Sequence, residues 1–243
     1  MPHIGGQLNA GKSGLLLSKS RPTTGETDAN FQSVAIPEDV TIWSWLFDSP
    51  YASSRRAKWP RIGGFRDATT GQFLSFSQVQ KLATQLSTSL VKVYGLRPGD
   101  GVCIFASNST WYPIALFAAV RLGAVVTGSS PEYGPDEISH ILRSSQAKLI
   151  FVDQGSLGSV TVAANGLKIN QTNILLLESQ PGSRDKPSAQ GLIDKAHASM
   201  LAELIPAFKL APGRSNKDVC AYLSFTSGTT SQPKGVSLST VPF

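Results

Sequence analysis

The stretch Leu223-Ser-Phe-Thr-Ser-Gly-Thr-Thr-Ser-Gln-Pro-Lys234 lies near the end of a chain of 243 residues. An apolar run, Val219–Leu223, leads into it and is typical of a short buried strand. Hydroxyl side chains surround Gly228, and Pro-Lys-Gly closes the run. Glycine lets backbone N–H groups turn toward an anion, hydroxyls add donors, and lysine supplies a positive charge. A Ser/Thr-rich surface turn would share this composition, but the closing Pro-Lys-Gly favours a loop that binds a polyphosphate.

A second phosphate-loop pattern occurs at Gly6–Ser13, where the GxxxxGK-Ser spacing of a P-loop is present. That mechanism needs a buried strand before the first glycine and a helix after the serine. Only Met1–Gly5 precedes the pattern, and Pro22 would end a helix soon after it. We therefore interpret this match as a chance one and reject an NTPase function.

Residues 1–36 are rich in Gly, Ser, Thr and Asn and lack periodicity, so we predict a flexible arm, followed by a folded part over residues 37–243. In the folded part, apolar runs alternate with helical patterns. The expected strands are 62–67, 72–76, 101–106, 124–127, 148–153, 173–177 and 219–223. The expected helices are 38–47, 77–94, 111–122, 135–145 and 191–204. This order predicts an α/β fold, a layered parallel sheet with flanking helices on both faces. Because so little chain follows the loop, we expect the strand before it to form an open edge.

The composition fits a soluble globular protein, with 41% hydrophobic and 16% charged residues. The net charge of +6 is thinly spread, and the dense basic run Arg55–Arg61 lacks a basic helix face or an aromatic platform. We interpret that run as a solvated loop and predict no nucleic-acid partner. No apolar run reaches the roughly 18 residues of a transmembrane helix, and no secretory signal is present, so we expect an intracellular, cytoplasmic protein.

The residue types that usually bind metals are few in this chain. Cys103 and Cys220 both lie inside apolar, strand-like runs, so we expect buried and inert thiols. The three histidines are scattered along the chain. We therefore predict no metal site built from protein side chains.

The loop resembles the signature loop of the adenylate-forming enzymes, and among them the acyl- and aryl-CoA ligases related to coumarate–CoA ligase and luciferase. Residues 226–236 match their Ser-Gly-Thr-Thr-Gly-x-Pro-Lys-Gly-Val run, with Ser231 where glycine is most common. Weaker similarity appears upstream in Phe73–Ser77, Gly95–Phe105 and Ile138–Val152, so that roughly residues 40–240 are covered. The resemblance implies the N-terminal part of the family's large domain.

Members of this family activate a carboxylic acid with ATP and Mg²⁺ as an acyl-adenylate, release pyrophosphate, and pass the acyl group to coenzyme A. The resemblance implies that the hydroxyls of the loop hold the β- and γ-phosphates. It also implies a catalytic role for Lys234, which would neutralise charge on the leaving pyrophosphate. The implied nucleotide-binding residues are Thr226, Ser227, Gly228, Thr229, Thr230, Ser231 and Lys234.

The other motifs of the family, for adenine, ribose and the C-terminal catalytic lysine, are missing. We therefore expect a C-terminally truncated fragment that supplies the phosphate loop and is inactive alone. The tail Val241–Phe243 departs from the family pattern, and we expect it to be translated intron or the end of a truncated gene model. A non-catalytic nucleotide-binding or dimerising fragment of the same lineage is one alternative, and an unrelated phosphate-binding module is another. The carboxylic acid stays open.

Overall fold

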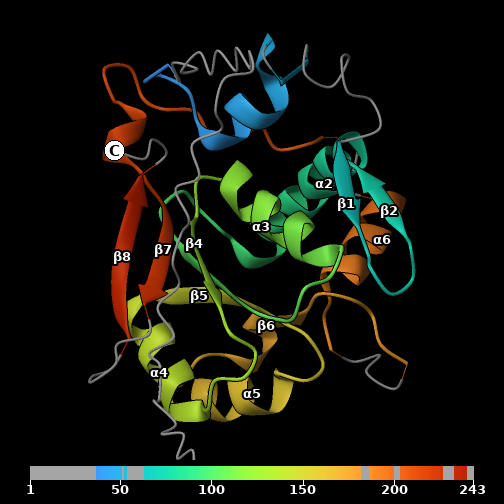
Figure 1. Cartoon of the computed structure of the whole chain (residues 1–243), viewed down its shortest axis with the longest axis vertical. Coiled ribbons are helices and arrows are strands. Elements are labelled where there is room, and N and C mark those ends of the chain that lie inside the picture. The colour runs from blue at the N-terminus through green and yellow to red at the C-terminus, as the bar shows by residue number, and fades with distance from the viewer. Residues whose placement is uncertain are drawn as a thin grey trace, which may run out of the picture. The chain divides into compact units, whose positions relative to one another are not determined.

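A six-stranded sheet forms the centre of the computed structural model, with strand order β6-β5-β3-β4-β7-β8 (Figure 1). The model describes residues 37–50, 52–53, 63–181, 186–199, 203–226 and 233–239. The strands are β3 (Gly101–Phe105), β4 (Val125–Ser129), β5 (Ala147–Val152), β6 (Ile174–Leu176), β7 (Cys220–Thr226) and β8 (Lys234–Ser239). Strands β3 to β7 pair in parallel, and β8 pairs antiparallel with β7. The predicted α/β fold with a parallel sheet is confirmed.

Helices cover both faces of this sheet, as the apolar strands require. Alternate residues of a strand point to opposite faces. On β3, Val102 and Ile104 therefore join one core cluster, and Cys103 and Phe105 join the other. Helices α2 (Phe76–Tyr94), α3 (Trp111–Arg121) and α6 (Ala189–Ser199) contribute to the first cluster, and α4 (Pro135–Ser144) and α5 (Leu157–Gly166) to the second.

Helix α2 shows how local sequence sets the ends of an element. Ser75 accepts a hydrogen bond from the backbone N–H of Gln78, and the Gln78 side chain accepts one from the N–H of Ser75. Gly95 ends the helix in the left-handed region with φ of 60°. A short antiparallel pair, β1 (Gly64–Arg66) and β2 (Phe73–Ser75), precedes the helix at the two places where strands were predicted.

The structure differs from the sequence-based expectation at three elements. The strand before the loop is not an open edge, because β8 pairs along it from Cys220 to Thr226. Helix α5 was not predicted, because its sequence is rich in small residues and lacks a clear apolar stripe. The helix expected at 38–47 is present but begins at Ile42 and consists mostly of a π-helical turn, Ser44–Asp48.

The two thiols differ in exposure. Cys103 is fully buried, and burial raises the pKa of its thiol to about 12. Cys220 is only half-buried, so the expectation of two buried thiols holds for Cys103 alone. The expected arm, including Gly6–Ser13, and the basic run Arg55–Arg61 lie outside the described residues. Over the part of the chain that the structure describes, no helix has the length and apolar character needed to cross a membrane.

Candidate functional site

The signature loop connects β7 to β8 in an antiparallel hairpin. Thr226 at the end of β7 and Lys234 at the start of β8 are cross-strand partners. Directly opposed residues of such a pair lie on one face, with Cβ atoms about 4.5–5.5 Å apart. The structure therefore brings together the first and last residues of the predicted phosphate site. The other predicted members, Ser227, Gly228, Thr229, Thr230 and Ser231, lie outside the described residues.

The pair Thr226–Lys234 lies on the face of the sheet that α2 and α3 cover. Tyr222 shares this face with Thr226 because side chains alternate along β7, and Tyr222 packs against the core cluster of α2 and α3. Phe225 points to the opposite face and packs against the cluster of α4 and α5. Lys234 is exposed, and its ammonium forms no ion pair with the described residues. An exposed lysine whose cross-strand partner carries a hydroxyl is suited to binding an anion.

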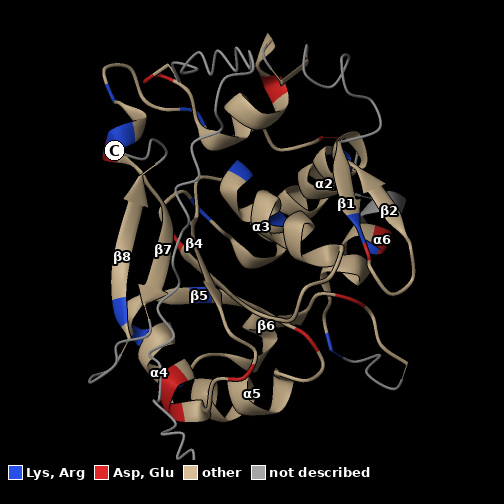
Figure 2. Ribbon diagram, viewed as in Figure 1, with Lys and Arg blue, Asp and Glu red and all other residues tan. Residues whose placement is uncertain are grey.

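A histidine of α4 contacts the hairpin where its two strands meet the connecting loop. His140 Nε2 lies 2.8 Å from the carbonyl oxygen of Pro233, and its ring meets Phe225 edge-on with centroids 6.2 Å apart. Helix α4 begins with two acidic residues in its first turn. Figure 2 shows these residues in red and the basic start of β8 in blue. In the sequence, His140 is one of three scattered histidines. The contact joins residues that are 93 positions apart, so no local pattern could reveal it.

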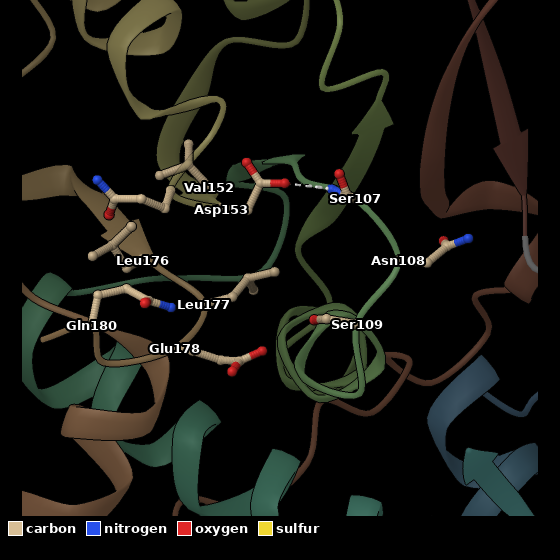
Figure 3. A pocket seen from close by; sticks show the side chains of 10 residues that line it. Ser107, Asn108, Ser109, Val152, Asp153, Leu176, Leu177, Glu178 and Gln180 are labelled. Atoms are coloured by element: carbon tan, nitrogen blue, oxygen red, sulfur yellow. Dashed lines mark hydrogen bonds between the residues drawn. The ribbon is translucent and has the colours of Figure 1, made fainter. Parts of the chain in front are cut away.

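A small cavity of about 90 Å³ lies where β3, β5 and β6 end (Figure 3). The connection after β3 leads to β4 on one side, and the connection after β5 leads to β6 on the other. Such a switch point at the carboxyl ends of parallel strands is a common ligand site. The lining residues are Ser107, Asn108, Ser109, Val152, Asp153, Gln154, Leu176, Leu177, Glu178 and Gln180.

Two carboxylates determine the charge of this cavity. Asp153 accepts hydrogen bonds from the backbone N–H groups of Ser107 and Ser156, both at 2.7 Å, and Figure 3 shows the first. Burial alone would raise the pKa of Asp153, but these hydrogen bonds outweigh it and hold the pKa below its usual value. Burial raises the pKa of Glu178, and the charge of Asp67 adds to that effect. No described Lys or Arg lines the cavity, so it disfavours a polyphosphate.

A larger hollow of about 690 Å³ lies between the β1–β2 hairpin and the start of α3. Aromatic and aliphatic side chains such as Phe65, Tyr112 and Leu116 form much of its wall. Such a wall suits an apolar group better than a polyphosphate. Arg66 also lines this hollow, but its guanidinium already donates to the carbonyl oxygen of Gly71 at 2.9 Å. The β7–β8 hairpin remains the candidate for the phosphate, because Lys234 there is exposed and forms no ion pair with the described residues. The described residues contain no cluster of three or more His, Cys, Asp or Glu that could hold a metal.

Comparison with known proteins identifies the family of this chain. Residues 54–241 match the model of a family described as AMP-binding enzyme. The chain is 30% identical to "4-coumarate--CoA ligase-like 2" of Arabidopsis thaliana over 175 residues, which cover 72% of this chain and 30% of that protein. It is also 30% identical to "Acyl-CoA ligase azaF" of Aspergillus niger over 208 residues, which cover 84% of this chain and 36% of that protein. The chain thus spans about a third of the length of these relatives.

Solved structures share the fold. A luciferase-like enzyme from the nonluminescent mealworm Zophobas morio matches with a TM-score of 0.64 at 23% identity, over 84% of this chain and 44% of that one. The anthranilate CoA ligase AuaEII, solved with anthranoyl-AMP, matches with a TM-score of 0.64 at 22% identity, over 84% of this chain and 35% of that one. The family match covers most of the chain, and the parallel sheet and the signature loop between β7 and β8 agree with it. This chain therefore belongs to the family of AMP-binding enzymes, which includes the acyl- and aryl-CoA ligases.

Proposed function

We propose that this chain is the part of an ATP-dependent acyl- or aryl-CoA ligase that holds the ATP phosphates. The observation that carries the proposal is the pairing of Thr226 with Lys234 across the ends of the signature loop. In the complete reaction a carboxylate attacks the α-phosphorus of ATP, pyrophosphate leaves, and the thiol of coenzyme A then displaces AMP from the acyl-adenylate. The names of the relatives, a coumarate–CoA ligase-like protein and an acyl-CoA ligase, support this reaction class.

In this proposal the residues of the hairpin act by position and charge. The hydroxyls of Thr226, Ser227, Thr229 and Thr230 would donate hydrogen bonds to the β- and γ-phosphates, and the backbone at Gly228 would approach them closely. Lys234 neutralises the charge that grows on the pyrophosphate as it leaves. Aligned donors and a nearby cation stabilise such a transition state without covalent participation of the protein.

Magnesium belongs to this proposal only as the partner of ATP. The described residues provide no carboxylate cluster for a dedicated ion. Mg²⁺ is commonly bound by substrate phosphates and a few ligands, so it would arrive with the nucleotide. We propose no ligand of coenzyme A among the described residues.

The chain itself should be catalytically incomplete, because it spans only about a third of its relatives. We propose that residues 37–243 form part of the ligase's large domain, that residues 1–36 are an arm, and that the protein acts inside the cell, where ATP and coenzyme A are available. The acid could be aromatic or aliphatic.

Binding of pyrophosphate and of Mg·ATP, measured by isothermal titration calorimetry, tests the phosphate site. Lys234→Ala removes the cation, and a charge-assisted contact of this kind corresponds to a roughly 10- to 100-fold weaker affinity. Lys81→Ala is the matched control, because Lys81 is an exposed lysine on α2. If neither ligand binds the wild-type chain, or if both variants bind equally well, the proposal is wrong.

Isotope exchange between ATP and pyrophosphate separates a ligase fragment from a minimal enzyme. We expect binding but no measurable exchange with aromatic, medium-chain or fatty acids. Exchange that disappears in Lys234→Ala would show that this chain completes the first half-reaction and would overturn the expected inactivity. Binding without exchange does not distinguish a ligase fragment from a non-catalytic nucleotide-binding protein, so the exchange should be repeated after adding back the missing part of a relative.

A further inference from the structure

We propose that His140 is a positioning residue for the phosphate loop, an inference that rests on the proposed function. The imidazole holds the peptide that precedes Lys234 and thereby orients the catalytic lysine toward the phosphates. His140 itself touches neither ATP nor the acid in this proposal.

The contact acts on the peptide unit that Pro233 shares with Lys234. The carbonyl oxygen of Pro233 lies 2.8 Å from His140 Nε2. Because a peptide unit is planar, fixing this carbonyl also fixes the direction of the backbone N of Lys234. A carbonyl oxygen can only accept a hydrogen bond, so Nε2 must carry the proton.

The same imidazole contacts the other strand of the hairpin. Its ring meets Phe225 at 80° with centroids 6.2 Å apart. Phe225 immediately precedes Thr226, and Pro233 immediately precedes Lys234. One side chain of α4 therefore touches both strands within one residue of the Thr226–Lys234 pair.

Helix α4 is a firm support for this contact. Ile138, Ile141 and Leu142 are each at most 1% exposed and belong to the core between α4, α5 and the sheet. The carboxylate of Glu137 accepts a hydrogen bond from the backbone N–H of Gly134 at 2.9 Å and closes the first turn. Because the helix is anchored at its start and along its buried face, the backbone that carries the imidazole is held in place.

Thr226 and Lys234 lie on the face of the sheet opposite α4. Phe225 points to the other face, toward α4. His140 can therefore hold the hairpin without occupying the space where an anion would meet the ammonium. Holding a binding loop in its bound conformation raises affinity because less motion is lost on binding.

Two substitutions at His140 separate the hydrogen bond from the packing. His140→Gln keeps an N–H donor at a comparable reach, and His140→Leu keeps an apolar contact with Phe225 but has no donor. We expect pyrophosphate to bind roughly 3- to 10-fold more weakly to His140→Leu, because the loss of one hydrogen bond weakens binding by about this factor. His140→Gln keeps the donor and should bind pyrophosphate with an affinity within about twofold of wild type. Ser144→Leu, at an exposed position of the same helix, is the control and should bind as wild type does.

Nitrogen-15 spectra of the imidazole of the wild-type chain test the contact without a variant or a ligand. The Nε2–H tautomer is expected, with slow exchange of that proton. The Nδ1–H tautomer, or undiminished pyrophosphate affinity in a folded His140→Leu chain, would refute the positioning role. If the Nε2–H bond is present but the wild-type chain binds no pyrophosphate, the proposed function fails and the positioning role falls with it, whereas the contact stands as a structural one.

Discussion

At the scale of single residues, polar side chains tie together loops that the sequence separates widely. Asp153 follows β5, yet its carboxylate holds the backbone of Ser107 after β3 and of Ser156 before α5. These bonds keep two loops at the carboxyl edge of the sheet close together. The strength of these hydrogen bonds depends on the charge of the carboxylate, since hydrogen bonds to an ionised acceptor are stronger than those to a neutral one.

Asp153→Asn should lower the free energy of unfolding by about 1–2 kcal/mol at pH 7, because the charge is lost and both hydrogen bonds weaken. The pKa of Asp153 is lowered in the folded state, so its contribution is fully present above the unfolded pKa of about 3.9 and is lost as the pH falls through the lower, folded value. Urea unfolding of both chains from pH 7 down to pH 3 measures this.

The difference between the two chains should therefore shrink below about pH 4. Asp194→Asn, at an exposed site on α6, is the control and should change stability little at any pH. A difference for Asp153→Asn that is equally large at pH 3 and pH 7 would contradict the assigned cause.

Arg121 is a second residue whose role depends on the tertiary structure. Its guanidinium is buried, donates to the Ser87 hydroxyl at 2.9 Å and to the carbonyl oxygen of Ile205 at 2.7 Å, and lies 5.5 Å from the centre of the Trp43 ring. Burial lowers the pKa of this guanidinium, and the charge of Asp48 opposes that shift. In the sequence Arg121 only ends an apolar run, so its three partners could not be foreseen.

At the scale of elements, glycines end helices α2 and α3 for different reasons. Gly95 has φ of +60° and Gly123 has φ of +72°, both in the left-handed region that favours glycine. An added Cβ at Gly95 would meet no atom within 4 Å, whereas at Gly123 it would lie 2.6 Å from the ring of Phe208. Gly95 is thus needed for its left-handed backbone conformation. Gly123 is needed both for that conformation and because a side chain there would clash with the ring of Phe208.

Gly95→Ala should lower the free energy of unfolding by about 1–2 kcal/mol, the cost of a left-handed alanine. Gly123→Ala should cost about 1–3 kcal/mol more, because the methyl group overpacks against Phe208. Urea unfolding of both variants measures the two costs.

Phe208→Ala is the matched test of the cause. It should reduce the excess cost of Gly123→Ala and leave the cost of Gly95→Ala unchanged, as a double-mutant cycle would show. Equal costs for the two glycines in the wild-type background would mean that the ring moves aside freely.

The hairpin shows the limit of prediction for elements. The Ser/Thr/Gly run predicted a loop, and the apolar run predicted the strand before it. Strand β8 was missed because its six residues include only two apolar ones, Val236 and Leu238, each more than 40% exposed. Pairing with β7, rather than any apolar pattern of its own, makes it a strand.

At the scale of the whole molecule, Asn216 joins the beginning of the described chain to its end. This fully buried residue donates from its backbone N–H to the carbonyl oxygen of Glu38 at 2.7 Å. Its amide donates to the carbonyl oxygens of Pro37 at 2.8 Å and of Val40 at 3.1 Å. These bonds hold residues 37–40 against the turn that leads into β7, the strand that carries the candidate site.

Asn216→Asp should lower the free energy of unfolding by about 2–4 kcal/mol, because a buried carboxylate would face two carbonyl oxygens with no donor to offer. Asn170→Asp is the matched control. The Asn170 side chain accepts a hydrogen bond from the N–H of Thr172, and a carboxylate can do the same. Chemical unfolding at pH 7 compares the two, and equal stability of both variants would show that the amide bonds of Asn216 contribute little.

The sequence by itself determined the α/β class, most of the strands, the ends of α2 and the position of the family's signature loop. These depend on local properties, namely apolar periodicity, capping residues and a contiguous signature. Only the tertiary structure decided that β8 pairs with β7, that Thr226 and Lys234 are neighbours across the hairpin, and that His140 of α4 contacts its base. Such relations depend on which distant segments the sheet and its helices bring together, and a contact between residues 93 positions apart leaves no pattern in either local stretch.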